Sequence, residues 1–194
     1  MKRGLIWRAF FSQSGSEIYE LSEKIGRFPD TIITNKRFED LDKINPKLLE
    51  KCFDRFLFLQ AKPTVEEYRE AIRHADIVTL HGYLRIVPPE VCGRFKIYNG
   101  HPGLITKYPE LKGKDPQAKV WWRHAETPYR EHGHVIHEVV PEVDAGRVVS
   151  ERSFTTQNLY RELDNLDNYI KRLHSLAIEN WTGFMQKRLL NNKL

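Results

Sequence analysis

The segment TVEEYREAIRHADIVTLHGYLRIVPPEVCGRFKIYN (residues 64–99) carries the pattern that decides the fold. It opens with a capping box, TVEE, which predicts a helix that ends near His74. The apolar run DIVTLH (76–81) predicts a buried strand, and Pro89 can begin another helix, because the first helical turn does not need its missing N–H. Residues 95–99 then predict a further strand. This helix–strand alternation indicates a parallel sheet with helices packed on its faces.

The first part of the chain repeats the alternation. Residues 4–11 predict a buried strand, and Ser16 can cap a helix that runs to about Ile25. Residues 31–34 and 55–59 predict two more strands, so the whole N-terminal half indicates an α/β protein.

The second half follows a different pattern. Residues 103–116 are rich in Pro, Gly and Lys and predict a long loop of the kind that carries function. A helix is expected over residues 117–125, followed by a strand pair at 134–140 and 147–151 that a turn joins. A long amphipathic helix from about Leu159 is expected to end the fold.

Composition excludes several classes of protein. The chain has 194 residues, 40% hydrophobic and 29% charged, which is typical of a globular domain and unlike a disordered or collagen-like chain. The net charge of +5 is small and acids are interleaved with the bases, so no nucleic-acid partner is expected. The longest stretch without Asp, Glu, Lys or Arg is 97–106, too short for the roughly 18–20 residues of a membrane span.

The cysteines and the N-terminus predict a cytoplasmic setting. Cys52 and Cys92 form no C-x-x-C motif, which favours reduced thiols and disfavours a structural zinc site. The start, MKRGLIWRAFF, is interrupted by Arg8 and is followed by no A-x-A-like cleavage site, so we interpret it as the first strand and not as a signal peptide.

Three segments are expected to meet at one edge of the sheet. Ligands of parallel sheets bind beyond the carboxyl ends of the strands. That places residues 12–16, 81–85 and 99–101 together. Neither G-x-G-x-x-G nor G-x-x-x-x-G-K-[ST] is present, which disfavours a dinucleotide or P-loop site.

The segment Tyr98-Asn99-Gly100-His101-Pro102 can do chemistry. Asn99 and His101 lie two apart, and Pro102 favours extended backbone, so both side chains point to one side. An amide N–H can hold an oxyanion and an imidazole can exchange a proton near neutral pH. Asp144 is the candidate partner for His101. The alternative is that Asn99 caps a turn and His101 is a loop residue.

Three blocks carry a family resemblance. They are HGYLRIV (81–87), NGHPGLITKYPELKG (99–113) and GHVIHEVVPEVDAG (133–146). Their order and spacing resemble the folate-dependent formyltransferase family, and its glycinamide ribonucleotide transformylase branch over most of residues 4–180. The resemblance implies an α/β, Rossmann-like three-layer sandwich with a mostly parallel central sheet, and one catalytic domain over residues 1–194.

The resemblance also implies a reaction. Asn99 and His101 would bind the formyl oxygen of 10-formyltetrahydrofolate while a primary amine attacks the formyl carbon. Asp144 would pair with His101 and relay the proton of the amine, with no metal. The implied partner is a small, anionic or nucleotide-like amine, and the implied state is a monomer or a homodimer.

Two further sets of residues follow from the matching segments. The implied folate-binding residues are Leu84, Arg85, Ile86, Val87, Val139, Val140, Pro141, Glu142 and Val143. The implied acceptor-binding residues are Ser12, Gln13, Ser14, Gly15, Ser16 and Lys107.

Departures from the branch concern mainly the acceptor. The branch binds its substrate phosphate on a loop after the first strand, and in this chain that loop ends in Glu17, which would repel a phosphate. Leu173 replaces a glutamate that contacts the ribose, and the loop after Pro102 reads GLIT (103–106) instead of Ser-Leu-Leu-Pro. The acceptor is therefore expected to differ from glycinamide ribonucleotide itself, and an amino sugar or modified nucleotide is an alternative.

The domains that the sequence contains disfavour two members of this family. No second C-terminal domain is visible, which disfavours methionyl-tRNA formyltransferase, and no N-terminal regulatory domain, which disfavours formyltetrahydrofolate hydrolase. A catalytically silent folate or nucleotide binder stays an alternative, although the intact Asn99, His101 and Asp144 argue against it.

Other clusters have plainer interpretations. His132, His134 and His137 would be metal ligands only if they converged, and on a strand His137 takes the opposite face from the other two. His137 is expected to support the active site instead. The lysines of the 103–119 region predict a solvated loop face that could meet the acceptor, and the aromatic residues of the last helix predict core or a dimer face.

Overall fold

A seven-stranded mixed sheet forms the centre of the computed structural model, which describes residues 4–126 and 128–191. Its strand order is β3-β2-β1-β4-β5-β6-β7, and neighbouring strands are parallel from β3 through β5 and antiparallel from β5 to β7. The strands are β1 (Trp7–Phe11), β2 (Thr31–Thr34), β3 (Phe56–Phe58), β4 (Ile77–Leu80), β5 (Ile97–His101), β6 (Glu131–Glu138) and β7 (Val148–Thr155).

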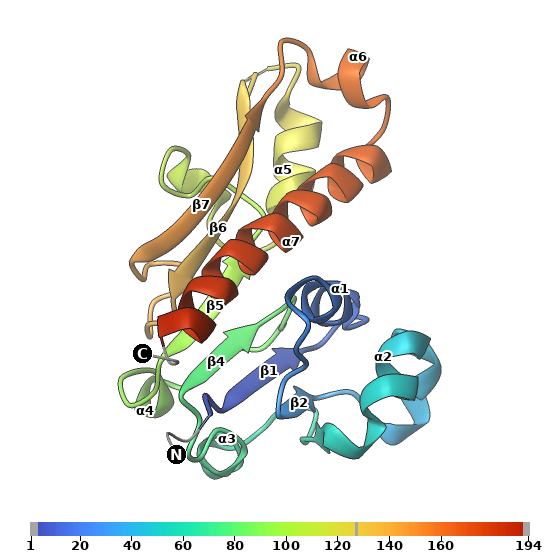
Figure 1. Cartoon of the computed structure of the whole chain (residues 1–194). Helices are drawn as coiled ribbons and strands as arrows, with labels where there is room; N and C mark the ends of the chain where they lie inside the picture. Colours follow the sequence, from blue (N-terminus) through green and yellow to red (C-terminus); the bar gives the residue numbers. More distant parts are fainter. Residues whose placement is uncertain (1–3, 127, 192–194) are drawn as a thin grey trace.

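Helices cover both faces of the sheet (Figure 1). They are α1 (Ser16–Ile25), α2 (Pro46–Cys52), α3 (Val65–Ala71), α4 (Pro89–Cys92), α5 (Pro116–Arg123), α6 (Leu159–Leu163) and α7 (Leu166–Asn191). Short 3-10 turns are η1 (Phe38–Lys43), η2 (Phe53–Arg55) and η3 (Pro109–Leu111). The expected α/β sandwich with a mostly parallel sheet is confirmed.

Alternating side chains of β1 divide the core between the two faces. Ala9 and Phe11 pack with α1, α2 and α7, whereas Phe10 packs with α3 and α4. Successive residues of a strand point to opposite faces, so one apolar strand serves both layers. A third apolar cluster joins β6 to α5, α6 and α7. In Figure 1, α7 runs diagonally across β6 and β7 and reaches α1.

Several local predictions are confirmed. The strand predicted at residues 31–34 is β2, and the capping box forms, with Thr64 Oγ1 accepting from the Glu67 N–H and Glu67 accepting from the Thr64 N–H. The strand pair before the last helix is present as β6 and β7, although both strands are longer than predicted.

Two local predictions are wrong, and one helix was not predicted. Ser16 does not cap α1, because Gly15, with φ of +75°, occupies the cap position and the Ser16 hydroxyl contacts Ser14 and Asn45 instead. The helix expected from Leu159 is split, since Asp164 has a φ of +58° and ends α6. Sequence reasoning also missed α2, although its signal, an Asn45 cap followed by proline, was present.

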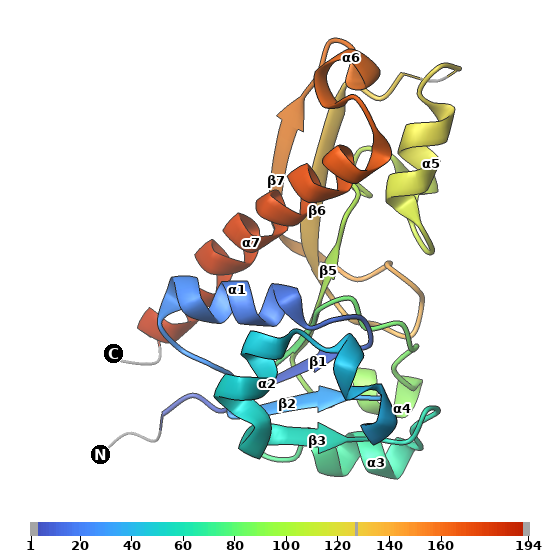
Figure 2. The ribbon, with the colours of Figure 1, turned by 90° about the vertical axis from the view of Figure 1, so that its right-hand side faces the viewer.

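The strand order places the site. The strands β1 and β4 are neighbours in the sheet, but the chain continues from β1 toward β2 on one side and from β4 toward β5 on the other. The loops that follow β1 and β4 therefore separate and leave a crevice at the carboxyl ends of these two strands. Figure 2 shows β1, β2 and β3 ending on the same side of the molecule. In residues 4–126 and 128–191, no helix has the length and apolar character needed to cross a membrane.

Candidate active site

A cavity of about 820 Å³ opens at this crevice. Its walls come from the loops after β1, β4 and β5, from residues 113–118, from the segment after β6 and from α7. The structure therefore brings together the three segments that the sequence placed at one sheet edge.

His101 ends β5 and is buried in the wall of this cavity. Its Nδ1 lies 3.3 Å from Asp144 Oδ2, and its Nε2 lies 2.9 Å from the carbonyl oxygen of Leu111. Burial lowers the pKa of His101 below its usual value, and the Asp144 charge and the Leu111 carbonyl only partly offset that effect. Both contacts are with hydrogen-bond acceptors, so the neutral ring donates to only one of them at a time.

Asp144 lies in the turn after β6 with a φ of +51°. Its Oδ2 accepts a hydrogen bond of 2.8 Å from the Gly113 N–H, and its Oδ1 lies 3.2 Å from His137 Nε2. Burial raises the pKa of Asp144, but the His137 hydrogen bond, the His101 charge and the Gly113 N–H outweigh burial, so the pKa lies below its usual value. The turn requires glycine at 146, where a Cβ would overlap the Glu138 carbonyl oxygen.

His137 connects Asp144 to Asn99. The register of β5 and β6 pairs Asn99 with His137, and Asn99 Nδ2 lies 3.2 Å from His137 Nε2. His137 Nδ1 donates to the Glu138 carbonyl oxygen at 2.9 Å. Asn99, His101, His137 and Asp144 thus lie in contact as one cluster, and we name it the reaction end of the cavity.

Apolar side chains surround the mouth of the cavity. Leu84, Ile86 and Val143 line it although each is more than half exposed. The Leu84 N–H donates to Ser12 Oγ at 2.9 Å, which ties the loop after β4 to the loop after β1. Exposed apolar side chains at the mouth of a cavity are typical of a ligand site.

The other end of the cavity lies at the start of α1, and we name it the acceptor end. Glu17 Oε1 lies 2.6 Å from His81 Nδ1, and His81 Nε2 lies 2.8 Å from Thr79 Oγ1. Burial raises the pKa of Glu17, but the hydrogen bond and charge of His81 outweigh burial, so the pKa lies below its usual value. His134 and His174 line the same end.

Comparison with known sequences decides the family. The sequence profile described as "Formyl transferase" matches residues 48–178, two thirds of the chain. The chain belongs to this family. A phosphoribosylglycinamide formyltransferase of Haemophilus influenzae is 33% identical over 93 residues, which are 47% of this chain and 40% of that protein. The matched stretch thus spans less than half of that relative.

Solved structures share the fold. A phosphoribosylglycinamide formyltransferase from Anaplasma phagocytophilum superposes with a TM-score of 0.78 at 20% identity, covering 97% of this chain and 89% of that one. A formyltetrahydrofolate deformylase from Pseudomonas syringae has a TM-score of 0.76 at 18% identity, covering 97% and 62%. At these identities the likeness shows the formyltransferase fold alone.

Most of the residues assigned by the family resemblance line the cavity. Asn99, His101 and Asp144 do so together. The folate-binding candidates that line it are Leu84, Arg85, Ile86, Val87, Val139, Val140, Pro141 and Val143. The acceptor-binding candidates that line it are Gln13, Ser14, Gly15 and Ser16.

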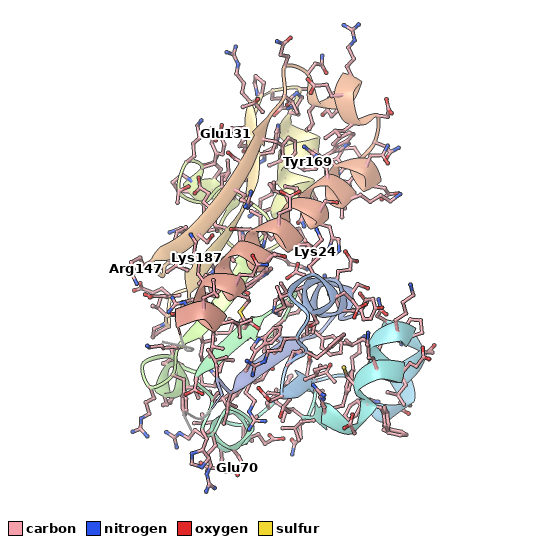
Figure 3. All side chains as sticks on the ribbon, viewed as in Figure 1. Lys24, Glu70, Glu131, Arg147, Tyr169 and Lys187 are labelled. Carbon is pink, nitrogen blue, oxygen red and sulfur yellow. The ribbon has the colours of Figure 1, made fainter. Side chains whose placement is uncertain are left out.

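Three assigned residues lie outside the cavity lining. Ser12 Oγ instead contacts Asn35 and accepts from the Leu84 N–H, so Ser12 holds two loops together. Glu142 is exposed and does not line the cavity. Lys107 pairs with Glu131 at the start of β6, well away from α1 (Figure 3). The binding roles assigned to these three residues therefore stay predictions.

The three histidines of β6 have separate partners. His132 contacts Tyr169, labelled on α7 in Figure 3, and Thr156. His134 contacts Asn180, and His137 contacts Asp144 and Asn99. Among residues 4–126 and 128–191, no three potential metal ligands converge on one point. His137 lies where it was expected, beside the candidate catalytic residues.

Sequence reasoning missed His81, His134 and the pairing of Glu17. The sequence predicts that Glu17 repels a phosphate, but it does not reveal the partner of Glu17, because His81 lies 64 residues away in the chain. The available signal was the position of His81 directly after a buried strand, where the sheet edge places it beside the loop after β1.

Proposed function

We propose that this chain transfers the formyl group of 10-formyltetrahydrofolate to a primary amine of a small acceptor, with residues 1–194 acting as one catalytic domain. The observation that carries the proposal is the Asp144 carboxylate between two histidines, beside Asn99, in the wall of a cavity. A carboxylate–histidine pair next to an amide is suited to acyl transfer, because it supplies a proton acceptor and oxyanion donors.

In the proposed reaction, the amine nitrogen attacks the formyl carbon, and the carbonyl π electrons move to the formyl oxygen. Asn99 and His101 donate hydrogen bonds to this oxyanion. The formyl oxygen takes the place of the Leu111 carbonyl oxygen, which now accepts from His101 Nε2. Asp144 accepts the proton that the amine loses, through water, and its lowered pKa keeps it ionised for this task.

Collapse of the tetrahedral intermediate completes the transfer. The oxyanion electrons reform the C=O bond, the bond from carbon to N10 of the folate breaks, and N10 takes the proton held at the Asp144–His101 pair. The products are the formamide of the acceptor and tetrahydrofolate. The mechanism needs positioned donors and a proton acceptor, and it uses no metal ion.

The mouth of the cavity supports folate binding. Leu84, Ile86 and Val143 offer apolar surface for the flat pterin, and the backbone between Val139 and Val143 offers hydrogen-bonding groups. Arg85 also lines the mouth, where its Nε donates to the Ala61 carbonyl oxygen at 2.8 Å. We assign Arg85 to the anionic distal part of the folate.

The proposed acceptor is a small, anionic or nucleotide-like amine, and the relatives from Haemophilus influenzae and Anaplasma phagocytophilum, which are named for phosphoribosylglycinamide, support this class. The test is a tetrahydrofolate-release assay with a panel of amines that includes glycinamide ribonucleotide and amino-sugar nucleotides. We expect release that depends on the amine and a formylated product of matching amount. Release at one rate with or without any amine would instead show hydrolysis, and absence of folate binding would show that the proposal is wrong.

A further inference from the structure

We propose that the acceptor end of the cavity selects an acceptor whose non-reacting part is uncharged and presents a hydroxyl group there, and that it rejects a phosphate ester. The inference deepens the proposed function and rests on it, because the acceptor must share the cavity with the formyl donor. The residues that determine this selection are Glu17 and His134.

Glu17 offers an open carboxylate oxygen. Its Oε1 is occupied by His81 Nδ1 at 2.6 Å, whereas Oε2 has no hydrogen-bond partner among residues 4–126 and 128–191. The side chain is 21% exposed and lines the cavity, so a ligand in the cavity can contact it. An ionised carboxylate only accepts hydrogen bonds, so this oxygen requires a donor from the acceptor molecule.

The position of Glu17 is fixed by a chain of buried groups. Trp7 Nε1 donates to Thr79 Oγ1 at 2.8 Å, and Thr79 contacts His81 Nε2 at 2.8 Å. The His81 ring also packs on Trp181, with 4.5 Å between ring centroids. Both nitrogens of His81 are therefore engaged within the protein, and His81 holds Glu17 instead of facing a ligand.

His134 supplies the complementary donor. Ser150 Oγ donates to Asn180 Oδ1 at 2.6 Å, which orients the amide so that Asn180 Nδ2 donates to His134 Nδ1 at 3.1 Å. The proton of neutral His134 therefore lies on Nε2, which has no partner within the described residues. This nitrogen faces Gly100, where a Cβ would lie 2.8 Å from it.

A hydroxyl group satisfies both positions. It can donate to Glu17 Oε2 and accept from His134 Nε2–H, and the charge of Glu17 already acts on His134. An ammonium group could donate to Glu17 but could not accept from His134. A phosphate dianion could not donate to Glu17 and would be repelled by its charge.

The hydroxyls that begin α1 do not offer a phosphate site instead. Ser14 Oγ and Ser16 Oγ lie 2.9 Å apart, Ser14 Oγ accepts from the Ser16 N–H, and Asn45 Nδ2 donates to Ser16 Oγ. The basic side chains that line the cavity, Arg85 and Lys114, come from other loops. No lysine or arginine of the described lining therefore offsets Glu17 at this end.

The test compares glycinamide ribonucleotide with its dephosphorylated ribonucleoside, which carries the same amine. Wild-type protein is expected to prefer the ribonucleoside by at least about tenfold in kcat/KM, because the phosphate dianion, which has the same sign of charge as Glu17, is then missing from the cavity. Glu17→Gln keeps an oxygen for His81 and removes the charge, so it should shift the preference toward the ribonucleotide by about tenfold or more.

Glu23→Gln is the matched control. Glu23 also lies on α1, pairs with Lys51 and does not line the cavity. Removing its charge should change the preference by no more than about twofold. A wild-type preference for the ribonucleotide would overturn the inference, and so would a Glu17→Gln shift no larger than that of Glu23→Gln.

Binding measurements separate this inference from the proposed function. Calorimetry with tetrahydrofolate-loaded protein measures affinity for the same two compounds without turnover. If no amine of the panel is formylated, the proposed function fails, but tighter binding of the ribonucleoside, lost in Glu17→Gln, would still support the inference. Tighter binding of the ribonucleotide, or binding of neither compound, would contradict it.

Discussion

The reaction end and the acceptor end of the cavity both pair a carboxylate with histidine, but the two carboxylates are satisfied differently. Both oxygens of Asp144 have partners, from His137 at one and from Gly113 and His101 at the other. Glu17 has a partner at one oxygen, His81, and its second oxygen is open to the cavity.

This difference indicates that the two carboxylates have different roles. A carboxylate whose oxygens are all bonded is rigid, and it can hold an imidazole and receive a proton without moving. A carboxylate with an open oxygen in a cavity demands a donor from the ligand, because a buried polar group without a partner is costly. The first arrangement suits catalysis for any acceptor, and the second suits the choice of acceptor.

Substitutions at the reaction end are expected to have the largest effect on the rate of formyl transfer. His101→Ala removes an oxyanion donor, and Asp144→Asn removes the proton acceptor while keeping its shape, so each should lower kcat by about a thousandfold or more. The measurement is single-turnover formyl transfer, with circular dichroism to confirm folding. Folate affinity should change by less than about threefold, since the mouth residues are intact.

Near-normal rates of formyl transfer in both variants would show that the proposed mechanism is wrong. If Asp144→Asn also changed the preference between phosphorylated and dephosphorylated acceptors, the two ends would not act separately.

The next largest effect is expected for a substitution of Gly100, where the reaction end and the acceptor end of the cavity meet. It lies between Asn99 and His101, and a Cβ there would lie 2.8 Å from both His134 Nε2 and Trp181 Nε1. Gly100→Ala should therefore displace His134, raise the acceptor KM by about tenfold and lower the free energy of unfolding by about 1–3 kcal/mol. Steady-state kinetics and urea denaturation measure the two effects.

Gly93→Ala is the control for Gly100→Ala. A Cβ at Gly93 has no atom within 4 Å, and the backbone φ of −78° suits alanine. It should leave both KM and stability nearly unchanged. An unchanged acceptor KM in Gly100→Ala, with weakened folate binding instead, would place His134 with the folate and not with the acceptor.

Much of the reaction end could be predicted from the sequence because its geometry is local. Asn99 and His101 lie on one strand, and the proline after them fixes the extended backbone. Strand–helix alternation likewise predicts the parallel part of the sheet, since a strand and a helix packed on it follow one another in sequence.

The acceptor end could not be predicted in the same way. Glu17 and His81 are far apart in sequence, and only the adjacency of β1 and β4 brings them to 2.6 Å. The positions of Ser12, Lys107 and Glu142 outside the cavity lining have a related cause. All three lie in turns or loops, where the direction of a side chain depends on φ and ψ values that a sequence does not reveal.

A smaller effect should appear in the pH dependence of stability. Burial lowers the pKa of both His132 and His134 to about 4, so the folded protein stays unprotonated at these rings while the unfolded chain takes up protons below about pH 6.5. Stability should therefore fall as pH drops from 6.5 to 4, by roughly 2–3 kcal/mol for each histidine. Asp144 and Glu17, whose pKa values are lowered in the folded protein, begin to lose their contributions near their usual pKa values of 3.8 and 4.5, at the lower end of this window, and lose the rest below it.

His132→Gln separates the two histidines, because His132 contacts Tyr169 and Thr156 and does not line the cavity. Urea denaturation between pH 7 and 4.5 should show a smaller loss of stability in this variant than in wild type, and the remaining loss comes from His134 and from His101 and His124, whose pKa values burial also lowers. Disappearance of the whole loss would mean that His134 is not held neutral, which the acceptor end requires.

The smallest effect is expected for Lys107, the one basic side chain assigned to the acceptor by resemblance. It pairs with Glu131 at the start of β6 and lies outside the cavity lining. More than half of its side chain is exposed to solvent, where salt screens its field beyond about 8–10 Å. Lys107→Ala should therefore leave the acceptor KM within about twofold of wild type. A tenfold rise in KM that is confined to phosphorylated acceptors would show that the 103–116 loop moves to cover the cavity. Lys107 would then offset the charge of Glu17 during turnover, and the contrast between the two ends would be weaker.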